Sequence, residues 1–155
     1  MKDFSVQIRN AEKSEAEALD ALLTKLIQYE TQFDSNLEKE YQVKNNYQEV
    51  IGKSGHKLLV AEADGQIVGF LYGFVYQIPG MFRQPVACLD ALFVSEPYRN
   101  HGIARALFLQ FKQFATENHA CRIELKVLSQ NESALHFYQK LSFQERKKHM
   151  ELDCF

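Results

Sequence analysis

Apolar and polar positions follow regular periods along the chain, and these periods predict its secondary structure. Residues 4–9 alternate between apolar and polar side chains, as in a half-exposed strand. Apolar residues then recur every three or four positions from residue 14 to about residue 32. Ser14 and Glu17 have the spacing of a capping box, so a helix is expected to begin near Ser14. A weaker helical pattern covers residues 37–51.

The middle of the chain has the pattern of a β-hairpin. Residues 57–63 and 67–78 read as two strands, and Asp64-Gly65 between them is a strong turn signal. The second strand is rich in aromatic residues. It also contains two glycines that predict a bulge or a close approach by another element, Gly69 and Gly73.

Strands and helices alternate in the second half of the chain. An apolar run, residues 86–94, is interrupted only by Asp90. The expected strands are 86–94, 122–128 and 143–152, and the expected helices are 103–118 and 131–141. This alternation, after a central hairpin, predicts one α/β domain over residues 1–155, with a mixed sheet and helices on both of its faces.

Composition narrows the class of protein. The chain has 155 residues, of which 46% are hydrophobic and 25% charged, and its formal net charge is −2. Nucleic-acid binding would call for a basic excess or a basic face. No apolar run approaches the roughly 20 residues that span a bilayer, and the N-terminal residues lack the apolar core of a signal peptide. We therefore expect a cytoplasmic protein with neither nucleic acid nor membrane as a partner.

The three cysteines, Cys88, Cys121 and Cys154, are far apart in the sequence. Their number and spacing support neither a disulfide framework nor a metal site. Cys88 and Cys121 stand in apolar runs and are expected to be buried side chains rather than nucleophiles.

Residues 86–105 contain the first candidate site. A buried strand leads through a turn into Arg99-x-x-Gly102-x-Ala104, where a helix begins. The first N–H groups of a helix have no intrahelical partner and carry partial positive charge, so they can hold a pyrophosphate. Gly102 keeps the approach open, and Arg99 and Arg105 offer charge-assisted bonds. Alone, this pattern fits a plain helix start equally well.

A second motif follows the strand at 122–128. It reads Asn131-x-x-Ala134-x-x-Phe137-Tyr138-x-Lys140. With both motifs in this order, the chain resembles the GNAT superfamily of N-acetyltransferases, closely over residues 86–143 and only in element order over residues 1–85. The resemblance implies an α/β fold with a mixed sheet of about six to seven strands and about four helices.

The resemblance also implies a cosubstrate, acetyl-coenzyme A, lying between two splayed parallel strands, residues 89–94 and 122–128. The residues that match cofactor-binding positions are Leu92, Phe93, Val94, Arg99, Asn100, His101, Gly102, Ile103, Ala104, Arg105, Asn131, Ala134, Phe137 and Tyr138. No metal is implied. The acetyl group would pass directly to an amine in a ternary complex, and a homodimer is compatible with the resemblance.

Two residues are candidates for proton transfer. Tyr138 matches the family's tyrosine that protonates or hydrogen-bonds the leaving sulfur, although an aromatic residue at helical spacing is also an ordinary core residue. Asp90 stands in an apolar strand, where loss of water should raise its pKa toward that of a base. Strand alternation would place Asp90, Leu92 and Val94 on one face. A buried Asp90 satisfied by its neighbours, Glu124 as the base, or a water relay are the alternatives.

The acceptor is less determined than the donor. The run Leu89–Val94 resembles the diamine acetyltransferase branch, which favours a polyamine, diamine or amino acid. The candidate acceptor-binding residues are Asp90, Glu124, Tyr29 and Phe33. A protein or peptide amine, or a non-catalytic coenzyme A-binding sensor, remains an alternative. The family's usual glycine is replaced by Ser142, which would cost about 1 kcal/mol in a left-handed conformation.

Overall fold

The structure is a computed structural model that describes residues 5–155. Within these residues five strands form one sheet in the order β1-β2-β3-β4-β5. Neighbours from β1 to β4 are antiparallel, whereas β5 is parallel to β4. The bounds are β1 Val6–Asn10, β2 His56–Ala63, β3 Gln66–Tyr76, β4 Val86–Val94 and β5 Ile123–Glu124. Phe4, with which the first strand was expected to begin, lies outside the described residues.

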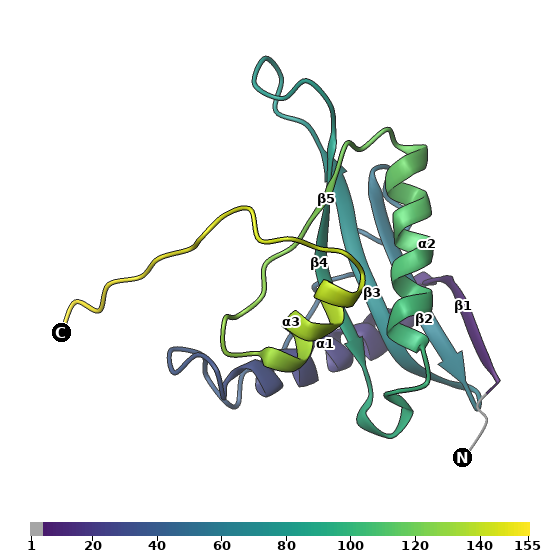
Figure 1. Ribbon diagram of the computed structural model, residues 1–155. Helices are drawn as coiled ribbons and strands as arrows, with labels where there is room; N and C mark the ends of the chain where they lie inside the picture. Colours follow the sequence, from purple (N-terminus) through teal and green to yellow (C-terminus); the bar gives the residue numbers. More distant parts are fainter. Residues whose placement is uncertain (1–4) are drawn as a thin grey trace.

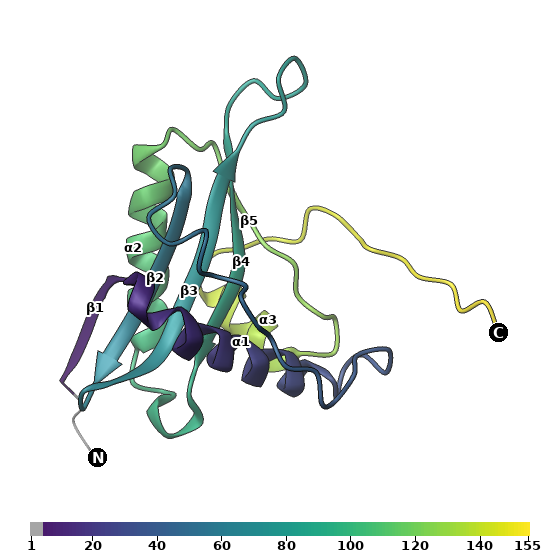
Figure 2. The same ribbon diagram turned by 180° about the vertical axis from the view of Figure 1, so that it is seen from behind.

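Helices cover both faces of this sheet, as Figures 1 and 2 show. They are α1 Ala16–Glu30, α2 Ile103–Glu117 and α3 Glu132–Lys140, with 3-10 turns η1 Lys13–Glu15 and η2 Glu96–Tyr98. The predicted apolar stripe of α2 is buried in one cluster against the sheet, with Leu107 and Phe111 fully enclosed. Leu19 and Leu22 of α1 pack in a second cluster on the other face. The α/β class and the two-sided packing are confirmed.

The predicted hairpin is present between β2 and β3. Asp64 and Gly65 have φ of 53° and 73°, the left-handed values that a tight two-residue turn needs. The close approach expected at Gly73 is also found. A Cβ there would lie 2.4 Å from the Phe111 ring and 2.6 Å from the Cys88 carbonyl oxygen, so only glycine lets α2 and β4 come this close.

The counts of elements were overestimated: five strands and three α-helices are found among residues 5–155, not six to seven and about four. The helix expected over residues 37–51 is absent. Asn45 is left-handed, with φ of 56°, which interrupts a helix. Two amides of this segment donate to side chains of α1: Val43 N–H to Thr24 Oγ1 (3.0 Å) and Asn46 N–H to the Asp20 carboxylate (3.3 Å). These tertiary bonds replace helical ones.

The C-terminal third also departs from the prediction. The strand expected over 122–128 shortens to β5, and residues 143–152 form no strand. Cys121, expected to be buried, is exposed.

The first helix is preceded by η1, where Arg9 holds the Glu15 carboxylate through two hydrogen bonds of 2.8 Å. In residues 5–155 no helix has the length and apolar character of a membrane span.

Candidate active site

The turn between β4 and α2 forms a cup of backbone N–H groups. Asn100 and Gly102 are both left-handed, with φ of 63° and 78°. The first helical bond of α2 runs from Ala106 N–H to the Gly102 carbonyl (3.0 Å), so the N–H groups of residues 103–105 precede the ladder. Such consecutive N–H groups at a helix N-terminus attract an anion. A Cβ at Gly102 would meet no protein atom within 4 Å, so the cup is open to a phosphate.

Arg99 braces this turn from the side of α1. Its Nε donates to the Val94 carbonyl oxygen at 2.8 Å. Its guanidinium lies 5.4 Å from the centre of the Phe93 ring and 5.8 Å from that of Tyr29. These contacts commit Arg99 to the end of β4, whereas it was expected to add charge at the phosphate. Arg105, by contrast, is exposed on the first turn of α2.

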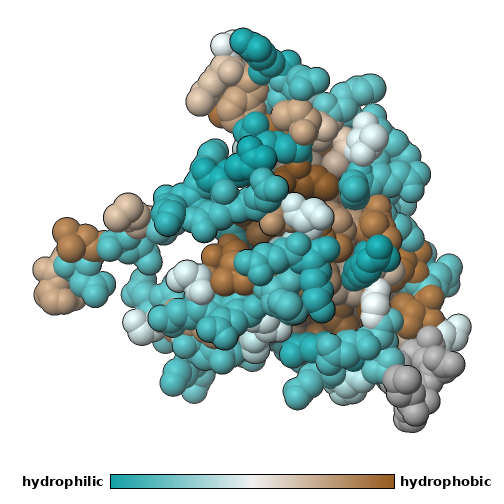
Figure 3. Space-filling model, viewed as in Figure 1, coloured by the Kyte–Doolittle hydropathy of each residue, from teal (hydrophilic) through white to brown (hydrophobic). Residues whose placement is uncertain are grey.

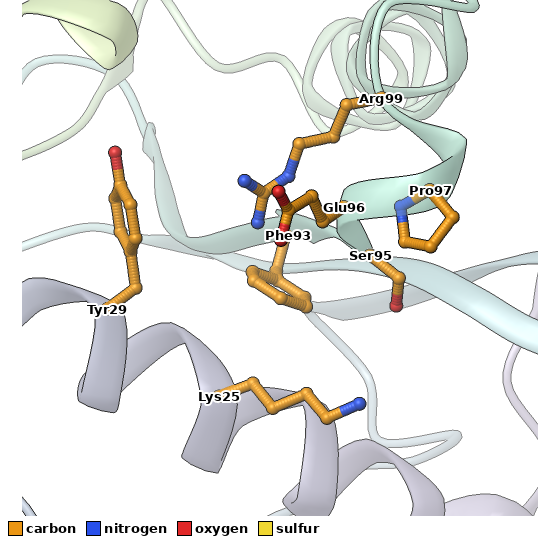
Figure 4. A pocket seen from close by; sticks show the side chains of 7 residues that line it. All are labelled: Lys25, Tyr29, Phe93, Ser95, Glu96, Pro97 and Arg99. Carbon is orange, nitrogen blue, oxygen red and sulfur yellow. The ribbon is translucent and has the colours of Figure 1, made fainter.

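An open pocket of about 340 Å³ adjoins Arg99 (Figure 4). It brings Tyr29, a candidate acceptor residue, next to Phe93, a candidate cofactor residue. Phe33 packs edge-on against Tyr29 with ring centres 5.6 Å apart. The lining residues are Lys25, Tyr29, Phe93, Ser95, Glu96, Pro97 and Arg99. The end of α1 therefore forms a wall beside the β4–α2 turn.

His101 lies on the outside of the turn. Its Nδ1 is 2.7 Å from the Arg99 carbonyl oxygen, so the ring folds back on its own loop. Asn100 and His101 are exposed, Ala104 is half-buried, and Ile103 is buried beneath the cup in the α2 cluster.

The sheet opens between β4 and the chain that follows β5. The two strands pair only at Ala87 with Ile123 and at Cys88 with Glu124. From Leu89 to Val94, β4 is paired with β3 on one side and with no strand on the other, as far as residues 5–155 are concerned. Successive residues of a strand direct their backbone groups to opposite sides, and the Ser95 N–H, two residues after Phe93, bonds the Val68 carbonyl on the β3 side. The backbone groups of Leu92 therefore face the open side and can bond an amide-bearing chain, those of Phe93 face β3, and the Val94 carbonyl is already taken by Arg99. Pairing therefore ends at Cys88 and Glu124, as a splay requires, but the second strand stops at Glu124 instead of continuing to residue 128 as predicted.

Helix α3 supplies the other predicted cofactor residues. Asn131 is buried and caps the helix, because its Oδ1 accepts from the Ala134 N–H at 3.2 Å. No described residue accepts from its amide nitrogen, which is left as a donor. Phe137 is half-buried, and its ring packs edge-on against Tyr138 at 5.2 Å.

Tyr138 packs against the α2 cluster and interacts electrostatically with the Glu30 carboxylate of α1. Burial, with Glu30 acting in the same direction, raises the pKa of Tyr138 to about 12. Its phenol is therefore protonated near neutral pH and able to donate. Its carbonyl accepts from Phe143 N–H at 3.0 Å. Ser142, just before, adopts the left-handed conformation expected at the family's glycine, with φ of 71°.

Asp90 occupies a β-bulge, and this changes its predicted surroundings. Tyr72 pairs with Ala91 and Gly73 with Leu89, so Asp90 is the extra residue between them. The bulge interrupts strand alternation. Leu92 and Val94 pack in the α2 cluster, whereas the Asp90 charge acts on tyrosines of the α1 side. The prediction that these three share one face was wrong, because a bulge offsets the period of two.

The environment of Asp90 is also more open than expected. Its side chain is solvent-exposed, not buried. It nevertheless lies among enough protein to lose hydration, which raises its pKa above the ordinary value, and Lys126 opposes this shift. The predicted direction of the pKa shift is therefore found without the predicted burial.

Three residues near Asp90 were not singled out from the sequence: Tyr47, Tyr72 and His56. Tyr47 is buried, and its hydroxyl has no partner among the described residues. Burial and the Asp90 charge raise the pKa values of both tyrosines. The Tyr72 hydroxyl lies 2.8 Å from His56 Nδ1, and burial lowers the pKa of His56. Tyr72 lies in the aromatic-rich strand that the sequence predicts over residues 67–78. Tyr47 lies in residues 37–51, which the sequence wrongly predicts to be a helix.

Glu124 is less available as a base than Asp90. Its carboxylate accepts a hydrogen bond from the Tyr76 hydroxyl, which raises the pKa of Tyr76 to about 12. It also lies 4.0 Å from Arg122 Nε. The nearby Cys88 thiol has its pKa raised to about 11, by burial first and then by Asp90 and Glu124. A neutral thiol is a poor nucleophile.

Comparison with known proteins identifies the family. The model of the acetyltransferase (GNAT) family matches residues 20–143. The chain belongs to the GNAT family. This match confirms the predicted family. Enzymes of this family take the acetyl group from acetyl-coenzyme A. The comparisons do not single out the diamine branch.

Similar proteins are found both by sequence and among solved structures. An uncharacterized N-acetyltransferase of Methanocaldococcus jannaschii is 31% identical over 88 residues, 57% of this chain and 39% of that protein, so the chain spans about two fifths of its length. A mutant of the BH1408 protein from Bacillus halodurans has the same fold, with a TM-score of 0.86, 22% identity and 96% and 99% of the two chains covered. The aminoglycoside N-acetyltransferase AAC(6')-Iy, solved in complex with CoA, also has this fold. Its TM-score is 0.74 at 19% identity, with 98% of this chain and 96% of that chain covered.

Proposed function

We propose that this protein transfers an acetyl group from acetyl-coenzyme A to a primary amine by direct attack within a ternary complex. One observation carries the proposal. Strand β4 combines an unpaired backbone edge, a cup of N–H groups at its end and the Asp90 carboxylate at its bulge. Thioester binding, phosphate binding and proton acceptance would then be organised by a single strand.

Each end of the cofactor has matching groups. The N–H groups from Asn100 to Arg105 would hold its pyrophosphate, and the open β4 edge at Leu92 would bond its pantetheine arm. The amide nitrogen of Asn131 would donate to the same arm, with Ala134 and Phe137 beside it. When bound, acetyl-coenzyme A supplies an activated acetyl thioester. An N–H on the β4 edge would stabilise negative charge that develops on the acetyl oxygen.

Proton transfer would divide between Asp90 and Tyr138. As the C–N bond forms and the C–S bond breaks, the amine loses a proton and the sulfur gains one. Asp90, with its raised pKa and exposed carboxylate, would accept the first, and the neutral Tyr138 phenol would donate the second. The raised pKa of Cys88 argues against a covalent acetyl-cysteine stage.

The acceptor is proposed to be a small primary amine, such as a polyamine, diamine or amino acid. A carboxylate near the aromatic rings of Tyr47 and Tyr72 would attract a cationic amine through charge and cation–π contact. Tyr29 lines the neighbouring pocket and Phe33 packs against it, whereas Glu124 is bonded to Tyr76 and is assigned a supporting role. We also propose that residues 1–155 act as one domain located in the cytoplasm.

An amine panel tests the proposal. Thiol release from acetyl-coenzyme A is followed with small primary amines, amino acids and peptide amines, while calorimetry measures cofactor binding. Release with a small primary amine is expected. Release only with peptides would move the acceptor to the protein class, and cofactor binding without release for any amine would favour a sensor.

A further inference from the structure

Two charged side chains of opposite sign lie on either side of the open edge of β4. Asp90 stands at the bulge of β4, and Lys126 follows the end of β5 by two residues. Both side chains are exposed. Neither has a hydrogen bond or an ion pair with any of residues 5–155. A carboxylate and an ammonium group are therefore both available to a ligand at this gap.

The register of the two strands places these charges opposite each other. Cys88 pairs with Glu124 in parallel, so two residues further along Asp90 comes opposite Lys126. Pairing has ended at that point. Paired strands lie about 4.8 Å apart, and chains that have stopped pairing lie farther apart. A small molecule between the two positions can therefore reach both side chains.

Both side chains lie on the α1 face of the sheet. Ile123 and Leu125 pack in the α2 cluster, so strand alternation turns Glu124 and Lys126 to the opposite face. The Asp90 charge acts on tyrosines of that same face. Lost hydration raises the pKa of Asp90, and the positive charge of Lys126 opposes this shift, so the two groups are close enough to interact.

The other charged side chains beside the gap already have partners. The Glu124 carboxylate accepts a hydrogen bond from the Tyr76 hydroxyl and lies 4.0 Å from Arg122 Nε. The Arg122 guanidinium also lies 5.7 Å from the centre of the Phe82 ring. Between β4 and the chain from Arg122 to residue 126, one acidic and one basic side chain thus remain for a ligand.

Cofactor and acceptor would approach this gap from opposite faces. Helices α2 and α3, with the proposed cofactor-binding groups, lie on the face seen in Figure 1, and α1 lies on the other face (Figure 2). Figure 3 shows the first face, where hydrophilic groups surround small hydrophobic areas near its middle. The face that carries Asp90 and Lys126 is therefore left to the acceptor.

We propose that the acceptor is an α-amino acid, whose ammonium group binds Asp90 while its carboxylate accepts a hydrogen bond from Lys126. This inference rests on the proposed acetyl transfer and narrows its acceptor. Lys126 becomes the residue that selects a carboxylate beside the reacting amine. A diamine or polyamine would instead bring a second ammonium group toward Lys126, and like charges repel.

Matched acceptors and matched variants test this selection. Acetyl transfer is measured for amino acids and for their amides, which keep the amine and lose the negative charge. The wild type should have the higher kcat/KM for the amino acid. The ratio of the two kcat/KM values should fall about tenfold in Lys126→Gln, the lower end for a hydrogen bond to a charged group because Lys126 is exposed, and it should recover in Lys126→Arg. Lys112→Gln, which changes an exposed lysine of α2, is the control and should keep the wild-type ratio.

Reversing the charge should reverse the preference, so Lys126→Glu should favour the diamine putrescine over an amino acid. An amino acid to amide ratio that stays the same in Lys126→Gln and Lys126→Glu would overturn the role of Lys126 and leave acetyl transfer intact.

Calorimetry on the protein saturated with coenzyme A measures acceptor binding without turnover. An amino acid should bind more tightly than its amide, and Lys126→Gln should remove the difference. Equal binding of the two by the wild type would overturn the proposed acceptor. Selective binding that depends on Lys126, but with no acetylated product, would support the amino-acid site and refute the proposed transfer.

Discussion

Replacing Gly102 with alanine probes the cup of N–H groups at the start of α2, and Gly52 provides a matched control. The two glycines have φ of 78° and 77°, and a Cβ at either position meets no protein atom within 4 Å. An alanine held in the left-handed region costs roughly 1–2 kcal/mol. Both variants should therefore lose about this much stability from backbone strain, which urea unfolding measures.

The two variants should differ in cofactor affinity. At Gly102 the new Cβ enters the space through which backbone amides would reach a phosphate, whereas Gly52 lies in the loop before β2. Loss of one hydrogen bond to a charged group costs about 1.5–3 kcal/mol, which weakens binding about 10- to 160-fold. Calorimetry with coenzyme A should show this loss for Gly102→Ala alone. Equal affinity of Gly102→Ala and Gly52→Ala would refute the assignment of the cup.

Three further predictions concern the bulge and its neighbours. Gly73→Ala would force a Cβ to 2.4 Å from the ring that packs on it, so a loss of about 3 kcal/mol is expected in urea unfolding, and an unchanged midpoint would contradict the packing. Partial loss of hydration raises the pKa of Asp90. Its favourable contribution to stability is therefore present below its ordinary pKa of 3.8 and disappears as the pH rises through the raised pKa. The Asp90→Asn variant should therefore be more stable than the wild type from about pH 4 upward. The same variant should lose the acidic limb of the pH–rate profile, and an unaltered limb would show that Asp90 is not the base. With its pKa near 11, the Cys88 thiol should be alkylated by iodoacetamide more slowly than the two exposed cysteines at about pH 8, and mass spectrometry that finds it labelled first would contradict its burial.

Local patterns predicted the elements whose side-chain periods run without interruption. The stripe of α2, the Asp64-Gly65 turn and the order of strands and helices around the two motifs were all recovered. The left-handed cost at Ser142 was anticipated from its place after α3. In each case neighbours in sequence determine the conformation.

Long-range contacts determined what the sequence did not predict. Residues 37–51 have helical spacing, but side chains of Asp20 and Thr24 bind their backbone and hold them as turns. The bulge at Asp90 depends on the pairing of β4 with β3, which alternation within one strand does not contain. The pairing of Tyr72 with His56 likewise joins two strands. Residues 143–152 have the pattern of a strand, but among residues 5–155 they pair with no strand of the sheet.

The most direct test of the account is the fate of the acetyl group. Acetyl-coenzyme A with an isotopically labelled acetyl group is incubated with the protein and a small primary amine, and the products are weighed by mass spectrometry. Direct acetyl transfer predicts a labelled N-acetyl amine for the wild type. Tyr138→Phe should form it about 10²- to 10⁴-fold more slowly while cofactor affinity stays the same. Release of coenzyme A without acetylated amine, or an unchanged rate for Tyr138→Phe, would contradict it.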